Sequence, residues 1–306
     1  MAYPIRHFEP QTIYFLTSRT AQSRFLLAPS DKTNELIGGI LARAVRQCEV
    51  ELFAYVFMSN HFHLMVRAPT AIAMSKFMQR LQSNLAIKVG RFVRWRGPFF
   101  ARRYSAEPIV DEKAQLARLV YILSHGVKEG LVSKVRRWPG LSCAQALLEG
   151  AMTSLHRWRN WTRRWKLEAH ADINVDRFSE ECPGEVESLT LTPLPCWAAL
   201  TAPQRSSLVA QLVAKIDADA PNKSERGVAH ITAQNPRGEP EQTKLTPRPK
   251  AHAANTPLWI EAVRRYRAFV AAFRQASLRW LDGDFNVEFP MNCFRPPPWS
   301  VPARIV

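Results

Sequence analysis

Residues 51–67 read ELFAYVFMSNHFHLMVR, two runs rich in aromatic and β-branched residues on either side of a Ser-Asn pair. Such runs around a turn signal predict a hairpin of two strands, 51–58 and 61–67. Side chains alternate between the two faces of a strand. The second strand therefore places His61, His63, Met65 and Arg67 on one face and Phe62, Leu64 and Val66 on the other. The apolar set suits a face covered by helices, so we expect the two imidazoles side by side on the open face.

The elements that flank this hairpin indicate the fold. They are a strand at 12–17, a helix capped by Asp31 that runs to about 48, a helix over 71–92, a strand near 104–110, and a helix from Glu112 to His125, capped by Asp111 and ended by Gly126. The order β-α-β-β-α-β is the ferredoxin-like plan. The sequence thus predicts an α+β fold with a four-stranded antiparallel sheet, helices on one face, and a mostly helical C-terminal extension.

Positive charge is concentrated in the first part of the chain. The 306 residues carry a net charge of +16. Residues 1–170 hold 26 Lys and Arg against 11 Asp and Glu, whereas residues 171–306 hold 16 against 15. Such an imbalance is typical of proteins that bind a polyanion. We therefore expect residues 1–170 to bind nucleic acid, with an affinity that falls steeply as salt rises.

The rest of the chain divides by composition. Residues 171–219 open with an acidic stretch and are interpreted as a connecting region. Residues 220–256 have many prolines and few large apolar residues, which is typical of a disordered linker. In the final part, 257–306, apolar residues recur at helical spacing before a proline-rich end.

Several classes of protein are excluded. No apolar run approaches the roughly 20 residues of a membrane-spanning helix, and the first residues lack the basic-then-apolar layout of a secretory signal. The five cysteines are scattered and never form a CxxC pair, which argues against a disulfide framework or a thiolate zinc site. The sequence predicts a cytoplasmic protein that does not bind membranes.

Two local patterns point to chemistry. Histidines at alternate positions of a strand, His61 and His63, can chelate a divalent metal, although the pair alone also fits two surface histidines. In the helix 112–125, Tyr121 and His125 are four residues apart and share a face near Arg118. We expect that face to turn away from the apolar stripe of Leu116, Leu119, Val120 and Leu123. A tyrosine so placed can act as a nucleophile, or it can simply pack against its neighbours.

Basic and aromatic residues alternate over residues 90–104, GRFVRWRGPFFARRY. Guanidinium groups can neutralise phosphates, and aromatic faces can stack on unpaired bases. The alternative is that the aromatic rings pack inside while the arginines face solvent. The candidate DNA-binding residues are Arg67, Arg91, Arg94, Arg96, Arg102, Arg103 and Arg118. A helix is also expected over 156–166, with its tryptophans on one buried face.

Four segments occur in order: FMSNHFHLMVRAP (57–69), KFMQRLQSNLA (76–86), GPFFARRY (97–104) and ARLVYILSHGVKEGLV (117–132). Over about residues 5–145 the chain resembles the single-tyrosine transposases of the HUH endonuclease superfamily, above all the REP-associated tyrosine transposases. The resemblance implies that His61 and His63 bind Mg²⁺ or Mn²⁺ and that Tyr121 is the nucleophile. It also implies a metal ligand four residues after the tyrosine, where His125-Gly126 replaces the usual Asn-Pro.

The activity implied by this resemblance is metal-dependent cleavage and rejoining of single-stranded DNA, at hairpin or repeat ends, through a 5′-phosphotyrosine. A single tyrosine suits one cleavage at a time, so a second strand or a second subunit of a homodimer would supply the other. The changed residues at 125 and 126 motivate an alternative, a catalytically weakened DNA-binding regulator that keeps the fold. A further alternative is an RNA-binding module with a ferredoxin-like fold. It is disfavoured because the predicted strands of this chain lack the aromatic consensus expected of such modules.

Overall fold

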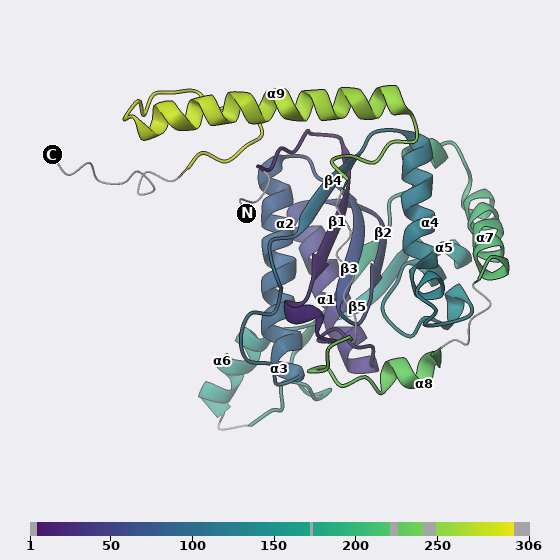
Figure 1. Ribbon diagram of the computed structural model, residues 1–306. Helices are drawn as coiled ribbons and strands as arrows, with labels where there is room; N and C mark the ends of the chain where they lie inside the picture. The colour runs from purple at the N-terminus through teal and green to yellow at the C-terminus, as the bar shows by residue number, and fades with distance from the viewer. Residues whose placement is uncertain (1–4, 172–173, 221–225, 241–248, 297–306) are drawn as a thin grey trace.

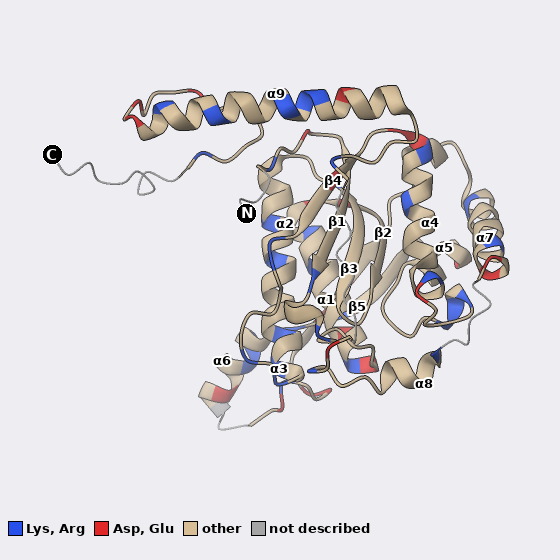
Figure 2. Cartoon of the chain, viewed as in Figure 1, with Lys and Arg blue, Asp and Glu red and all other residues tan. Residues whose placement is uncertain are grey.

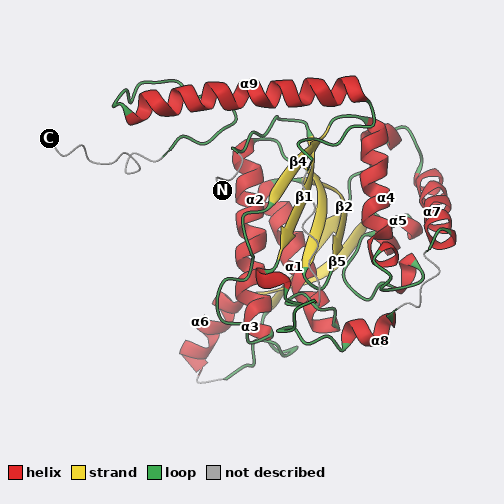
Figure 3. Cartoon of the chain, viewed as in Figure 1, coloured by secondary structure: helices red, strands yellow, loops and turns green. Residues whose placement is uncertain are grey.

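The computed structural model describes residues 5–171, 174–220, 226–240 and 249–296. A central sheet of four antiparallel strands has the order β2-β3-β1-β4 (Figures 1 and 3). The strands are β1 (Ile13–Arg19), β2 (Glu51–Phe57), β3 (His61–Arg67) and β4 (Ser105–Ile109). Helices connect them in the order of the ferredoxin-like plan, which confirms the predicted α+β fold.

Two helices cover one face of this sheet. They are α1 (Asp31–Cys48) and α2 (Ala71–Asn84), and α2 continues through a π-helical turn (Leu85–Val89) into α3 (Gly90–Phe92). Phe62, Leu64 and Val66 are fully buried on this face, as their alternation predicts. The first helix is capped by Ser30 rather than Asp31, because the Ser30 hydroxyl accepts the Thr33 N–H.

The other face of the sheet is not open. Helix α4 (Glu112–Lys128) packs across β2 and β3, so the prediction of helices on one face only is wrong. The helix also runs past Gly126, which does not end it. A Cβ on Gly126 would lie 3.0 Å from the Trp138 ring and 3.2 Å from Val132. Close packing therefore explains this glycine better than helix termination does.

A small second sheet covers the outer side of α1. Strands β5 (Thr153–Arg159) and β6 (Gly184–Thr190) pair antiparallel, and both contact α1. A Cβ on Gly39 would lie 2.2 Å from the Arg157 carbonyl oxygen, so only glycine lets β5 approach this closely. The helix expected over 156–166 is thus wrong in its first half. Its second half starts α6 (Trp161–Ala171), where Trp165 remains 66% exposed instead of packing in the core.

Acidic residues of β6 form ion pairs with arginines of α1. Arg43 Nη1 lies 2.6 Å from a Glu185 oxygen and 2.7 Å from a Glu187 oxygen, and Arg46 Nε lies 2.7 Å from the other oxygen of Glu187. Part of the excess positive charge of residues 1–170 is therefore neutralised by residues beyond 170. The expected division at residue 170 runs between two paired strands, so DNA binding is best measured on the whole chain.

The remaining helices pack around this body. They are α5 (Ala144–Glu149), α7 (Ala202–Ala218), α8 (Gly227–Thr232) and α9 (Thr256–Leu281), with short 3₁₀ turns at Ala21–Ser23, Val135–Arg137 and Pro195–Trp197. Helix α9 agrees with the helical spacing noted in the sequence of 257–306, and it lies across the end of the sheet and extends past α2 (Figure 1). No described helix is both long enough and apolar enough to cross a membrane.

The predicted linker 220–256 is only partly within the described residues, because 221–225 and 241–248 lie outside them. Its described part is structured. Ile231 of α8 is fully buried, and His252 forms a parallel bridge with Ile109 at the edge of β4. The end of the proline-rich tail, 297–306, also lies outside the described residues.

Candidate metal and tyrosine site

Three imidazoles meet between β3 and α4. His61 and His63 come from alternate positions of β3, and His125 comes from α4. One ligand nitrogen from each of the three lies within 4.8 Å of the others. His61 Nε2 and His125 Nε2 are only 2.8 Å apart. The structure thus brings together the three residues expected to hold a metal ion.

The burial of this cluster differs from the expectation. His63 and His125 are buried between the sheet and α4, and His125 is only 2% exposed. His61 and His63 therefore do not lie on an open face, and His125 does not point away from the core. The reason is that α4 buries two sides, one against the central sheet and one against α7. A single apolar stripe in the helix sequence cannot reveal the second side.

Neighbouring side chains orient two of the rings. The Thr17 hydroxyl lies 2.8 Å from His63 Nδ1, and the Asn60 side-chain oxygen lies 2.6 Å from His61 Nδ1. The Asn60 amide nitrogen donates to the Ser23 carbonyl, which fixes its oxygen toward His61. With both Nδ1 atoms engaged, the Nε2 atoms remain for a ligand. Consistent with this, His63 Nε2 is buried without a hydrogen-bond partner among the described atoms.

The protonation of the cluster also suits a cation. Burial lowers the pKa of His61 and His63 well below the usual range, and lowers that of His125 to about 4. All three imidazoles are therefore neutral at neutral pH, and the neutral form is the one that binds metal. Buried, neutral, convergent nitrogens with unsatisfied acceptors fit a divalent metal ion.

Tyr121 lies against this cluster. Its ring centroid is 5.3 Å from that of His63 and 5.0 Å from that of His125, and the side chain is half-buried. Burial raises the pKa of the phenol above its usual value, Glu129 acts in the same direction, and Arg118 opposes both. The phenol is therefore protonated in this state, next to the histidines and accessible from one side.

Cations surround the tyrosine ring. The Arg118 guanidinium carbon lies 5.0 Å from the Tyr121 ring centroid, and Lys128 Nζ lies 4.8 Å from it. Arg19 is opposite His61 in the register of β1 and β3. Of these three cations, only Arg118 is among the candidate residues predicted from the sequence. Lys128 lies two helical turns after Tyr121, so its place near the tyrosine could have been predicted from the sequence. The position of Arg19 could not, because it depends on the register of β1 against β3.

The other proposed DNA-binding arginines lie elsewhere. Arg67 is at the far end of β3, where it forms a bidentate ion pair with Glu51 and is not part of the site. The arginines of the 90–104 segment are exposed (Arg91, Arg94, Arg96, Arg102 and Arg103). Figure 2 shows that α2 and α9 also carry Lys and Arg, so positive charge is spread over several elements.

The aromatic residues of the 90–104 segment pack inward. Phe99 is buried, Phe100 packs edge-on against Phe62, and the half-buried Phe92 packs against Phe178. These three rings therefore pack against the protein, whereas the arginines of the segment are exposed.

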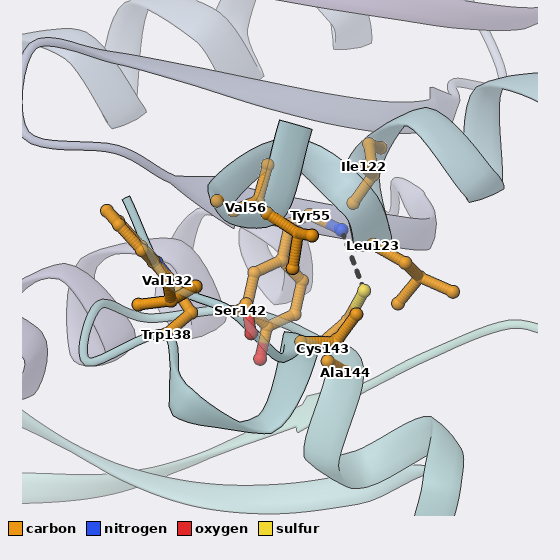
Figure 4. Close-up of a pocket in the computed structure, with 12 residues that line it drawn as sticks. Tyr55, Val56, Ile122, Leu123, Val132, Trp138, Ser142, Cys143 and Ala144 are labelled. Carbon is orange, nitrogen blue, oxygen red and sulfur yellow. Dashed lines mark hydrogen bonds between the residues drawn. The ribbon is translucent and has the colours of Figure 1, made fainter. Parts of the chain in front are cut away.

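An apolar hollow lies beside the other side of α4 (Figure 4). Its lining includes Ile122, Leu123, Val132 and the buried Cys143. The Tyr55 N–H donates to Cys143 Sγ at 3.3 Å. Burial raises the pKa of this thiol to about 12, so no thiolate nucleophile is available there.

We expect Thr17→Val to weaken metal binding by about 10- to 100-fold, the usual cost of losing an outer partner of a histidine ligand. Valine has nearly the same shape but cannot hold His63 Nδ1, so the ring is free to turn. Titration of Mn²⁺ into the full-length protein measures the change. Thr17→Ser, which keeps the hydroxyl, is the matched control, and equal affinities for Thr17→Val and the unsubstituted protein would show that Thr17 does not orient the ligand.

Comparison with known proteins places these residues in context. Residues 14–124 match the family described as transposase IS200-like, and the match includes His61, His63 and Tyr121 but ends one residue before His125. Comparison with curated proteins gives no significant match.

Two solved structures are similar to part of the chain. One is a REP-associated tyrosine transposase bound to a REP hairpin, with 18% identity and a TM-score of 0.43 over 49% of this chain and 86% of that one. The other is a protein from Deinococcus radiodurans described as a transposase, with 21% identity and a TM-score of 0.29 over 38% of this chain and 94% of that one. Over residues 14–124, the chain is similar to the family of IS200-like transposases.

Proposed function

We propose that the protein is a metal-dependent transposase that cleaves and rejoins single-stranded DNA, at hairpin or repeat ends, through a 5′-phosphotyrosine on Tyr121. The observation that carries this proposal is the contact of Tyr121 with His63 and His125, two of the three convergent imidazoles. The match of residues 14–124 to the IS200-like transposase family supports the same reaction class.

The proposed reaction exchanges one phosphodiester bond for another. The Tyr121 oxygen forms a bond to phosphorus, and the bond from phosphorus to the 3′ oxygen of the preceding nucleotide breaks. The phenol proton passes to water, and the leaving 3′ oxygen takes up a proton to become a 3′-OH. The phosphotyrosine retains the energy of the phosphodiester, so a 3′-OH can later reverse the step and rejoin the strand.

The chain's residues have separate tasks in this reaction. His61, His63 and His125 would hold Mg²⁺ or Mn²⁺. When bound, the metal would supply positive charge to the oxygens of the scissile phosphate. Tyr121 is a weak nucleophile at neutral pH, because a phenol has a pKa of about 10 and burial raises it further. Arg118 and Lys128 at its ring favour the phenolate that must form during attack.

The replacement of the family's Asn-Pro by His125-Gly126 motivated the alternative of a weakened regulator. Two observations favour the enzyme. His125 completes the nitrogen cluster, and Gly126 fits between Trp138 and Val132 without interrupting α4. The regulator predicts DNA binding without covalent chemistry, which an adduct assay separates from the proposed activity.

The test uses the full-length protein with single-stranded oligonucleotides from the DNA that flanks its gene, and with Mg²⁺ or Mn²⁺. A 5′-phosphotyrosine keeps the downstream piece of DNA on the protein. A 3′-labelled strand should therefore migrate with the protein on a denaturing gel, while a 5′-labelled strand should yield a shorter free fragment. A chelator should abolish both products. DNA binding without any adduct would favour the regulator.

A further inference from the structure

Three cations approach Tyr121 from different parts of the fold. Arg118 and Lys128 come from α4, three residues before and seven residues after the tyrosine, at 5.0 Å and 4.8 Å from its ring centroid. Arg19 ends β1, and because it is opposite His61 it shares the face of the sheet that carries the histidines. Burial raises the pKa of Tyr121 and lowers that of His125, and the charge of Arg19 opposes the first shift and adds to the second. The three cations thus border one region, next to the tyrosine and the imidazoles.

These cations differ from the ion-paired arginines elsewhere in the chain. Arg159 is fully buried and lies 2.7 Å from a Glu35 oxygen, and the half-buried Arg43 lies 2.6 Å from a Glu185 oxygen. Within the described part of the chain, neither Arg19, Arg118 nor Lys128 forms an ion pair or a side-chain hydrogen bond.

Two carboxylates lie in the surroundings of these cations without pairing with them. Glu107 faces His252, at 3.4 Å, and Glu129 is exposed at the end of α4. Neither approaches the three cations to ion-pair distance among the described residues.

Such an arrangement is unfavourable in the free protein. A half-buried guanidinium loses part of its hydration, and like charges around one ring repel each other. Burial accordingly lowers the pKa of both Arg19 and Arg118. An anion with several oxygens would relieve both costs, because guanidinium groups bind phosphate oxygens with strong charge-assisted hydrogen bonds.

We infer that Arg19, Arg118 and Lys128 form a clamp that binds the phosphodiester attacked by Tyr121. The inference rests on the proposed function, and it names how that function holds its substrate. The exposed arginines of the 90–104 segment would bind phosphates farther along the strand, whereas the clamp binds the one at the tyrosine. The inference adds Lys128 and Arg19 to the residues proposed to bind DNA.

The clamp predicts opposite effects on stability and on DNA binding. We expect Arg19→Met to leave the melting temperature of the free protein unchanged or raised, since it removes an unpaired, half-buried charge. The same change should lower the affinity for single-stranded DNA. The probe is a 20-residue oligothymidylate, bound to the full-length protein without added metal at several salt concentrations. The plot of log affinity against log salt should lose about 0.7 of its slope, the value for one phosphate contact on a single strand.

Lys128→Met should reduce the salt slope in the same way, and Arg19→Lys should restore most of it, because it keeps the charge. Arg274→Met is the matched control, since Arg274 is an exposed arginine on α9. Two results would overturn the clamp. One is a slope for Arg19→Met no lower than that of Arg274→Met. The other is a lower melting temperature with unchanged binding, which would make Arg19 a structural residue. If the slopes change as expected but no adduct forms, the phosphate site stands and the proposed cleavage fails.

Discussion

Tyr121→Phe is expected to abolish the covalent protein–DNA adduct and to leave DNA binding within about twofold of the unsubstituted protein. The substitution removes one oxygen atom, and among the described residues no other tyrosine ring contacts the imidazoles of the cluster. Loss of an attacking nucleophile costs at least about 10³-fold in rate. The measurement is single-turnover formation of the adduct with a 3′-labelled strand, and the melting temperature checks that the fold is intact.

Tyr104→Phe is the matched control for this experiment. Tyr104 is only 6% exposed, its hydroxyl has no hydrogen-bond partner among the described atoms, and the Arg6 guanidinium carbon lies 3.6 Å from its ring centroid. Its removal should leave adduct formation unchanged. An adduct that persists in Tyr121→Phe and disappears in Tyr104→Phe would transfer the role of nucleophile to Tyr104.

The core of the fold could be predicted because its information is local. The hairpin at 51–67 has two alternating strands around a short turn, and each helix that follows carries its own capping residue and periodicity. The order of these elements is enough to specify the ferredoxin-like plan. These features depend on neighbouring residues only, so the sequence predicts them well.

The covering of the second face and the small second sheet could not be predicted in the same way. Strand β5 is a strand because β6 pairs with it, and β6 begins 25 residues after the end of β5 at Arg159. The tryptophans and arginines of 156–166 fit a helical pattern when read alone. Tertiary pairing overrides that local pattern, and the contact of β5 with α1 depends on Gly39, far away in the sequence.

In the candidate site, too, the features within one element could be predicted, whereas those that depend on tertiary contacts could not. His61 and His63 are two residues apart, and Tyr121 and His125 are four apart, so each pair could be recognised within one element. That the two pairs meet is a consequence of α4 lying on β3. Thr17 and Arg19 could not be assigned from sequence, because only the register of β1 against β3 places them opposite His63 and His61.

His125→Ala is expected to cause a large loss of metal affinity. It removes one of three convergent nitrogens, so the affinity for Mn²⁺ should fall by more than the roughly 10- to 100-fold cost of losing an outer partner. Adduct formation at limiting metal should fall in parallel. The measurement is a titration of Mn²⁺ into the full-length protein, followed by the adduct assay at each metal concentration. His230→Ala, which removes an exposed histidine of α8, is the control.

His125→Asn restores the family residue at this position. An amide oxygen is a harder ligand than an imidazole nitrogen, so cleavage with Mg²⁺ should be retained and any preference for Mn²⁺ should diminish. If His125→Ala keeps full metal affinity and activity, the ion is held by His61 and His63 alone.

The pH dependence of metal binding separates the buried cluster from surface histidines. Only the neutral imidazole binds a metal ion, so protonation releases the ion as the pH falls through the pKa of the ligands. Because burial lowers the pKa of His125 to about 4, and those of His61 and His63 well below 6.5, the neutral forms persist into acidic solution. Mn²⁺ should therefore stay bound as the pH falls through 6.5, and it should be released only at lower pH. Release centred near 6.5 would instead indicate exposed histidines, and it would contradict a site enclosed between β3 and α4.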